Sequence, residues 1–182
     1  RVILPADSVA VSKLTWIIAQ QYGPFYMRMC RSKTPIIHND SQEFQVGKAI
    51  TMREGSDCTI AACGITVKMA LDAADLLNQD GISCRVIDCF SIKPIDKELL
   101  EKAARETGAI VTCEEHNVMG GFGSAVSEVV SESYPVPIRR IGVQDKFGES
   151  ARDNEIAQLL EKHGMTPINI INMVKEARSQ KQ

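Results

Sequence analysis

Two arginines close a short apolar run near the start of the chain. The strand that we expect over 25–30 follows a Gly-Pro pair and ends near Arg28 and Arg31. Side chains on a strand alternate between its faces, so this odd spacing sends the two arginines to opposite faces if the strand continues that far. One guanidinium can then form a structural ion pair while the other points towards an anion. A phosphate is a suitable anion, because a guanidinium offers paired donors and a fixed charge.

Glu114, Glu115 and His116 follow a strand that we expect over 109–113. Open α/β sheets place their ligands at the carboxyl ends of strands, and two carboxylates beside an imidazole can bind a metal or move protons. However, neighbours on an extended strand point to opposite faces, so Glu114 and Glu115 do not easily hold one ion. A role in a loop or an interface is the interpretation that we favour for the three residues.

A glycine-rich segment, Gly120-Gly121-Phe122-Gly123, lies between that strand and a predicted helix. Dinucleotide phosphates bind at such a junction in other folds, but here Val126 stands where the pattern requires a third small residue. A tight turn that lets the helix pack closely on the sheet is the better interpretation. His38 and His163 are isolated in the sequence, and we expect both at the surface.

Composition indicates an ordinary globular protein. The chain has 182 residues, of which 44% are hydrophobic and 24% charged, with a formal charge of -2. This charge argues against nucleic acid as a partner, and no apolar run is long enough to span a membrane. No pair of cysteines forms C-x-x-C, so reduced thiols packed in the core of a cytoplasmic protein fit best, rather than metal ligands. The cysteines are Cys30, Cys58, Cys63, Cys84, Cys89 and Cys113.

Short apolar strands alternate with helices along most of the chain, which is typical of a parallel sheet with helical crossovers. We predict an α/β fold, a three-layer α/β/α sandwich with a mostly parallel sheet of about five strands. The strands of this sheet are expected at 49–53, 58–63, 84–89, 109–113 and 137–143, and the helices at 66–78, 96–105, 121–133, 153–163 and 167–179.

The first residues have a different organisation. A strand at 2–4, a helix over 9–22 and the strand at 25–30 cannot cover both faces of their own sheet. Residues 1–31 are therefore predicted to be the end of a larger α/β domain. The polar stretch at 32–47 is predicted to be an inter-domain linker, and 48–182 a second domain.

Five motifs in this order resemble the transketolase family. Pro5-Ala6-Asp7, followed by a helix and Gly-Pro-x-Tyr-x-Arg-x-x-Arg, is similar to the end of the pyrimidine-binding domain. The others resemble the C-terminal domain of transketolases and the segment leading into it. They are Glu43-Phe44-Gln45-Val46-Gly47-Lys48-Ala49, Cys63-Gly64-Ile65-Thr66, Phe90-Ser91-Ile92-Lys93-Pro94-Ile95-Asp96, and Glu114-Glu115-His116 with Gly120-Gly121-Phe122-Gly123.

The resemblance implies part of an enzyme that uses thiamine diphosphate and Mg to move a two-carbon ketol unit between sugar phosphates. Transketolase active sites lie between the subunits of a dimer, so a homodimer is expected. The position that binds the substrate phosphate in the family matches Arg31. No catalytic, cofactor-binding or metal-binding residue is carried over besides it.

The chain departs from the complete family pattern. It lacks the Gly-Asp-Gly to Asn segment that holds metal and diphosphate, and also the glutamate and the aromatic that act on the cofactor ring. We therefore expect a split transketolase whose N-terminal subunit or domain supplies these groups, with this chain inactive alone. The alternatives are a non-catalytic assembly or regulatory module, or part of a deoxyxylulose-phosphate synthase or of a 2-oxo acid dehydrogenase E1 β subunit.

Overall fold

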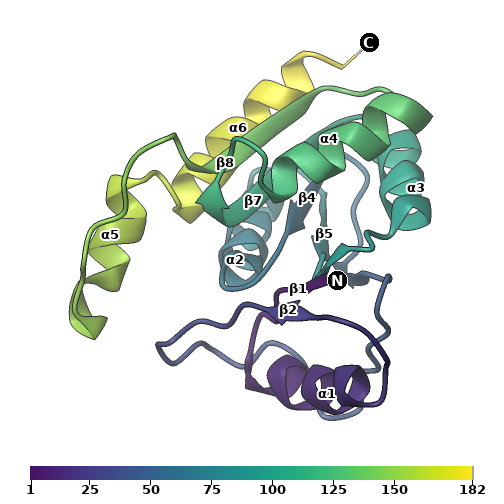
Figure 1. Ribbon diagram of the computed structural model, residues 1–182. Coiled ribbons are helices and arrows are strands. Elements are labelled where there is room, and N and C mark those ends of the chain that lie inside the picture. The colour runs from purple at the N-terminus through teal and green to yellow at the C-terminus, as the bar shows by residue number, and fades with distance from the viewer. Residues whose placement is uncertain (182) are drawn as a thin grey trace.

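A five-stranded sheet forms the centre of the structure, a computed structural model that describes residues 1–181 except the side chain of Asp153. Its strand order is β3-β5-β4-β7-β8; β3 is antiparallel to β5, and all other neighbours are parallel (Figure 1). The prediction of a mostly parallel sheet of about five strands is confirmed. The strands are β3 (Ile50–Arg53), β4 (Cys58–Ala62), β5 (Cys84–Asp88), β7 (Ile110–Asn117) and β8 (Ile138–Val143).

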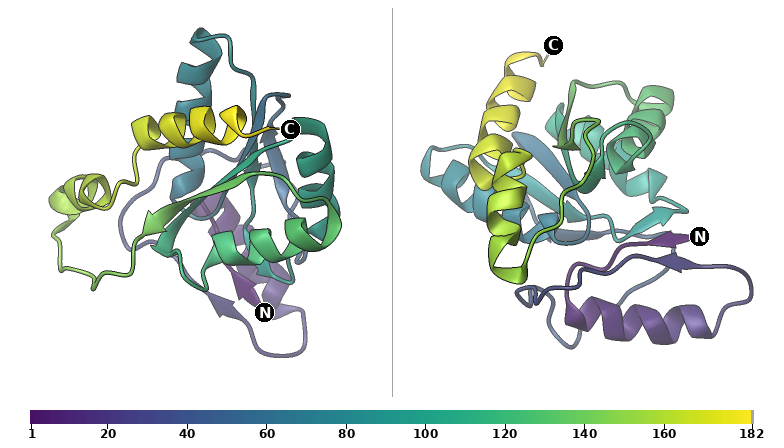
Figure 2. Two further views of the ribbon diagram at one scale, coloured as in Figure 1. Left: turned by 90° about the horizontal axis from the view of Figure 1, so that it is seen from above. Right: turned by 60° about the vertical axis from the view of Figure 1, so that its left-hand side comes forward.

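Helices cover both faces of this sheet and complete the three layers. α2 (Thr66–Gln79) and α6 (Pro167–Ser179) bury their alanines and aliphatic residues on one face. α3 (Lys97–Thr107) and α4 (Phe122–Ser133) pack on the other face. Figure 2 shows α6 and α4 on opposite sides of the sheet. The expected α/β/α sandwich is therefore present.

A second, small sheet lies beside the first, with strand order β2-β1-β6. β1 (Val2–Ile3) and β2 (Tyr26–Met27) are parallel and are connected through α1 (Ser8–Ala19). β6 (Ser91–Lys93), which the sequence did not predict, pairs antiparallel with β1. In Figure 1 this small sheet and α1 lie below the main sheet. β6 therefore connects the first residues of the chain directly to the large domain.

Several elements have bounds that differ from the expected ones. β2 is only two residues long and ends before either arginine, whereas β7 continues to Asn117 and so includes Glu114, Glu115 and His116. α1 starts where Asp7 accepts a hydrogen bond from the N–H of Ala10 at 2.8 Å, a normal N-cap.

The C-terminal region contains a short 3-10 helix (Asp153–Glu155) and α5 (Ile156–Lys162) before α6. Residues 32–47 contain neither helix nor strand. Among residues 1–181, no helix is both long and apolar enough to cross a membrane.

Candidate functional site

Arg28 connects the end of β2 to β7. Its side chain is half-buried, and its Nη1 donates a hydrogen bond of 2.7 Å to the backbone carbonyl oxygen of Glu115. Because β2 ends at Met27, the alternation rule does not extend to Arg31. The structure thus gives Arg28 a structural contact between two segments that are far apart in the sequence.

Arg31 is exposed and borders a pocket of about 380 Å³. Arg28 and Glu115 line the same pocket, which α5 and the following loop close from the other side. His163, expected at the surface, is half-buried and also lines this pocket. The pocket contains two guanidinium groups and an imidazole, which suit an anionic group, together with the carboxylates of Glu115 and Glu149.

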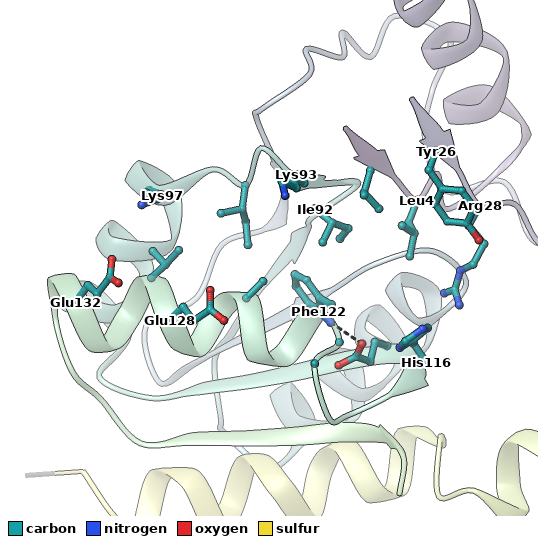
Figure 3. A pocket seen from close by; sticks show the side chains of 17 residues that line it. Leu4, Tyr26, Arg28, Ile92, Lys93, Lys97, His116, Phe122, Glu128 and Glu132 are labelled. Carbon is teal, nitrogen blue, oxygen red and sulfur yellow. Dashed lines mark hydrogen bonds between the residues drawn. The ribbon is translucent and has the colours of Figure 1, made fainter. Parts of the chain in front are cut away.

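A larger cleft of about 540 Å³ opens on the other side of Arg28 (Figure 3). Arg28, His116 and Tyr26 stand at one end of it, and Leu4, Ile92 and Phe122 form an apolar middle. Lys93, at the end of β6, stands beside this middle part, and three charged side chains of α3 and α4 stand at the far end: Lys97, Glu128 and Glu132. Arg28 therefore separates two pockets, and only the smaller one also contains Arg31.

Glu114 is a buried carboxylate that caps α4. Its Oε2 accepts a hydrogen bond from the N–H of Phe122 at 2.6 Å, and its Oε1 one from the N–H of Gly123 at 2.8 Å. A Cβ on Gly121 would lie 2.2 Å from Glu114 Oε2, so only glycine fits the turn. The position where a phosphate would bind at a helix N-terminus is thus filled by a carboxylate of the chain itself. The glycine-rich segment thus forms a tight turn before α4, as the sequence predicts.

The three residues of the Glu-Glu-His run do not converge on one point. Burial raises the pKa of Glu114, and the two N–H donors oppose this only in part. Burial also raises the pKa of Glu115, against the lowering effect of the Arg28 charge. His116 is exposed, with its Nδ1 3.1 Å from the carbonyl oxygen of Asn117. A helix cap and an interface contact describe this run better than a metal site or an acid–base pair.

The expectation that His38 lies at the surface is wrong. Its side chain is fully buried, with Nδ1 3.1 Å from Asp7 Oδ2 and Nε2 3.2 Å from Asp88 Oδ2. No sequence signal identified this cluster, because its members come from three separate segments that meet only in the fold.

The cysteines pack in the core, as predicted. Five of the six are buried, and Cys30 is half-buried. Burial raises the pKa of Cys58 to about 12 and that of Cys84 to about 11, so these thiols stay protonated at neutral pH.

The start of α4 offers no open anion site, because Glu114 already accepts its first N–H groups. Among residues 1–181, no group of three or more His, Cys, Asp or Glu could hold a metal ion.

Comparison with known proteins agrees with this α/β architecture. The family model "Transketolase, C-terminal domain" matches residues 47–170, and the chain belongs to this family. It is 40% identical over 177 residues to "6-deoxy-6-sulfo-D-fructose transketolase subunit SqwH" of a Clostridium species, covering 97% of this chain and 54% of that protein. It is 43% identical over 156 residues to one of the subunits of an apulose-4-phosphate transketolase of Phocaeicola vulgatus, covering 85% of this chain and 50% of that protein.

A solved structure supports the same assignment. The chain is 44% identical to "Split gene transketolase, inactive beta4 tetramer", with a TM-score of 0.95, over 100% of this chain and 58% of that one. The chain thus spans about half the length of the curated relatives it matches.

Proposed function

We propose that this chain is the C-terminal part of a split, thiamine-diphosphate-dependent transketolase that moves two-carbon ketol units between sugar phosphates. The observation that carries the proposal is the position of Arg31, exposed at the end of the β2 segment and bordering a small pocket. Membership of the transketolase C-terminal domain family supports the reaction class. The chain contributes substrate-phosphate binding and subunit assembly, and it is inactive alone.

Arg31, rather than Arg28, is the phosphate ligand in this proposal. The side chain of Arg28 donates to the Glu115 carbonyl oxygen, so one nitrogen of its guanidinium group is used in a structural contact. The side chain of Arg31 is exposed, so a sugar phosphate can reach it. A guanidinium is suited to this task because it binds phosphate oxygens in pairs and stays charged at all relevant pH values.

The thiamine diphosphate and Mg belong, in this proposal, to an N-terminal subunit or domain. The names of two relatives describe them as transketolase subunits, which supports a partner of this kind. The solved neighbour is described as a tetramer, so we also infer self-association of this chain, with a homodimer as the smallest assembly. Buried thiols support a reducing, cytoplasmic location. We assign residues 1–31 to the end of a pyrimidine-binding domain, 32–47 to a linker and 48–182 to the C-terminal domain.

Substitution of Arg31 in the enzyme reconstituted with its N-terminal partner tests the proposal. A hydrogen-bonded charge of this kind contributes about 1.5–3 kcal/mol, so Arg31→Ala should lower kcat/KM by about 10- to 150-fold. The loss should appear mainly in KM, because the phosphate is remote from the reacting carbons and is bound alike in ground and transition states. Arg31→Lys should recover only part of the lost kcat/KM, since an ammonium lacks the paired donors of a guanidinium.

The matched comparison uses phosphorylated and unphosphorylated acceptors. The kcat/KM of the Arg31→Ala enzyme should fall far more for the phosphorylated acceptor than for the unphosphorylated one. An equal loss on both would mean that Arg31 does not bind phosphate. Turnover of a 2-oxo acid, with none of a ketose phosphate, would favour the 2-oxo acid dehydrogenase alternative.

A further inference from the structure

His38 joins three segments that are far apart in the sequence. Its imidazole lies between Asp7, in the loop before α1, and Asp88, at the end of β5. The separations are 3.1 Å from Nδ1 to Asp7 Oδ2 and 3.2 Å from Nε2 to Asp88 Oδ2, and the three side chains are fully buried. The imidazole of His38 is thus one of the contacts that connect the first residues of the chain to the main sheet.

Asp7 also fixes the backbone of the segment that follows Arg31. Its Oδ2 accepts hydrogen bonds of 2.8 Å from the N–H groups of Ile37 and His38, while its Oδ1 caps α1. The backbone of Ile37 and His38 is therefore held by the same carboxylate that contacts the imidazole. Arg31 lies six residues before Ile37 in the same stretch of chain.

Asp88 depends on the charge of His38. Within residues 1–181, neither of its carboxylate oxygens accepts an aligned hydrogen bond, and the 3.2 Å contact with Nε2 is an ion pair when the imidazole is protonated. The charged groups that face the imidazole are Asp7 and Asp88, and the linker adds the ring of Phe44 at 5.1 Å. A buried carboxylate without a compensating charge is strongly destabilising, so a neutral imidazole would leave Asp88 unpaired.

The directions of the pKa shifts agree with this dependence. Burial alone would lower the pKa of His38, but the contact with Asp88 and the charges of both carboxylates outweigh it and raise the pKa. Burial raises the pKa of Asp88, which His38 opposes only in part. Both shifts make the folded protein less stable as the pH rises, because His38 and Asp88 each keep a proton to higher pH in the folded chain than in the unfolded one.

The stability contributed by His38 is therefore complete below the pKa of an unfolded histidine, about 6.5, and is lost as the pH rises through its raised folded pKa. The stability contributed by Asp7 depends on pH in the opposite direction. Burial would raise its pKa, but its backbone hydrogen bonds lower it, so its contribution is lost only as the pH falls through that lowered pKa.

We propose that charged His38 is a positioning residue, which holds Asp7 to Asp88 and thereby fixes the segment carrying Arg31 in its phosphate-binding position. This inference rests on the proposed role of Arg31. When His38 loses its proton at higher pH, the segment loosens and the affinity for the substrate phosphate falls. The chemistry at the cofactor, which other parts of the enzyme perform, is unaffected.

The reconstituted enzyme tests the proposal through a pH profile. In the wild type, KM for the phosphorylated acceptor should rise as the pH increases above about 6.5, the pKa of an unfolded histidine. Once the pH response of Arg31→Ala is subtracted, kcat and the KM for the unphosphorylated acceptor should not change with pH. In His38→Gln, KM should be raised roughly 2- to 30-fold already at pH 6, as is typical of changes that act on a site from a distance, and should not respond to pH. Subtracting the Arg31→Ala response removes the ionisation of the substrate itself.

Thermal unfolding of the same samples supplies a second readout. The Tm of the wild type should fall with rising pH, and that of His38→Gln should lack this response and be lower at pH 6 by roughly 3–6 °C. His116→Gln, which replaces an exposed histidine, should keep the wild-type slope. Should His38→Gln not fold, Asp88→Asn removes the buried charge and should reduce the pH response of KM in its place.

The two readouts, Tm and KM, distinguish a positioning role of His38 from a purely structural one. If Tm responds as described but KM does not, His38 is only a structural residue and the inference is wrong. If His38→Gln and His116→Gln have the same pH profiles of both Tm and KM, the imidazole carries no charge that matters, which also overturns it. If Arg31→Ala does not discriminate between the two acceptors, the proposed function itself fails, and the Tm profiles still report on the cluster.

Discussion

The carboxylate of Glu114 holds the first turn of α4 in place. It accepts two backbone N–H groups that have no partner within the helix. Glu114→Gln keeps the shape of the side chain, but one of its two oxygens becomes an amide nitrogen that cannot accept. We expect a loss of about 1–3 kcal/mol in the free energy of unfolding, because a buried N–H is left unpaired.

Urea unfolding of the two proteins measures this loss. Glu128→Gln is the matched control, because Glu128 lies exposed on the same helix, and its substitution should change stability by no more than about 0.5 kcal/mol. Equal losses in the two variants would show that the cap contributes nothing specific.

The same residues show why only part of the site could be predicted. The Gly-Pro pair, the two arginines and the glycine turn have local signals, and their positions follow from the sequence. The capping role of Glu114 depends on β7 continuing to Asn117, which brings the side chain back to Gly121 and Phe122. The burial of His38 depends on two distant carboxylates. Contacts of this kind become visible only when the separate segments are placed in space.

At the scale of elements, α6 is attached to the molecule by one apolar stripe. Ile170 is 1% exposed and packs in the core shared with α2, whereas Ile168, on the same helix, is 67% exposed. Ile170→Ala should cost about 2–5 kcal/mol of unfolding free energy, because it removes buried methylenes and leaves a cavity.

Ile168→Ala is the control with the same chemistry at an exposed site. It should change the free energy of unfolding by at most about 0.5 kcal/mol. Thermal or urea unfolding measures both variants, and a similar cost at the two positions would mean that α6 does not pack against the sheet in solution.

Periodicity predicted most elements of the main sheet to within a few residues, because each one buries a regular apolar stripe or run of its own. β6 was missed for a physical reason. It is three residues long, and its pairing partner β1 lies at the start of the chain, far from it in the sequence. β2 was predicted too long, since its apolar residues continue past the two that pair with β1.

At the scale of the whole molecule, several contacts of different kinds hold the first residues to the rest of the chain. β1 pairs with β6, Leu4 N–H donates to the Phe90 carbonyl oxygen at 2.7 Å, and Arg28 donates to Glu115. The His38 cluster adds a charge contact. Residues 1–31 are therefore an integrated part of this structure, although their sheet has only two short strands of its own.

The chain alone should not bind thiamine diphosphate, since the start of α4 is taken and no metal-binding cluster is present among residues 1–181. Calorimetric titration of the 182-residue chain with thiamine diphosphate and Mg should therefore show no saturable binding at micromolar concentration. The complex with the N-terminal partner is the positive control. Saturable binding by the chain alone would contradict the proposed division of labour between the two parts.

The distribution of sulfur atoms has a practical consequence for studying the strand end. Thiol reagents attack the exposed thiolate form, and five of the six thiols are buried in the folded protein. Cys30 is the exception, and it directly precedes Arg31. A fluorophore or spin label added to the native protein will therefore attach mainly at one place, without removal of any other cysteine. The natural sequence thus provides a spectroscopic reporter beside the residue whose surroundings are of most interest.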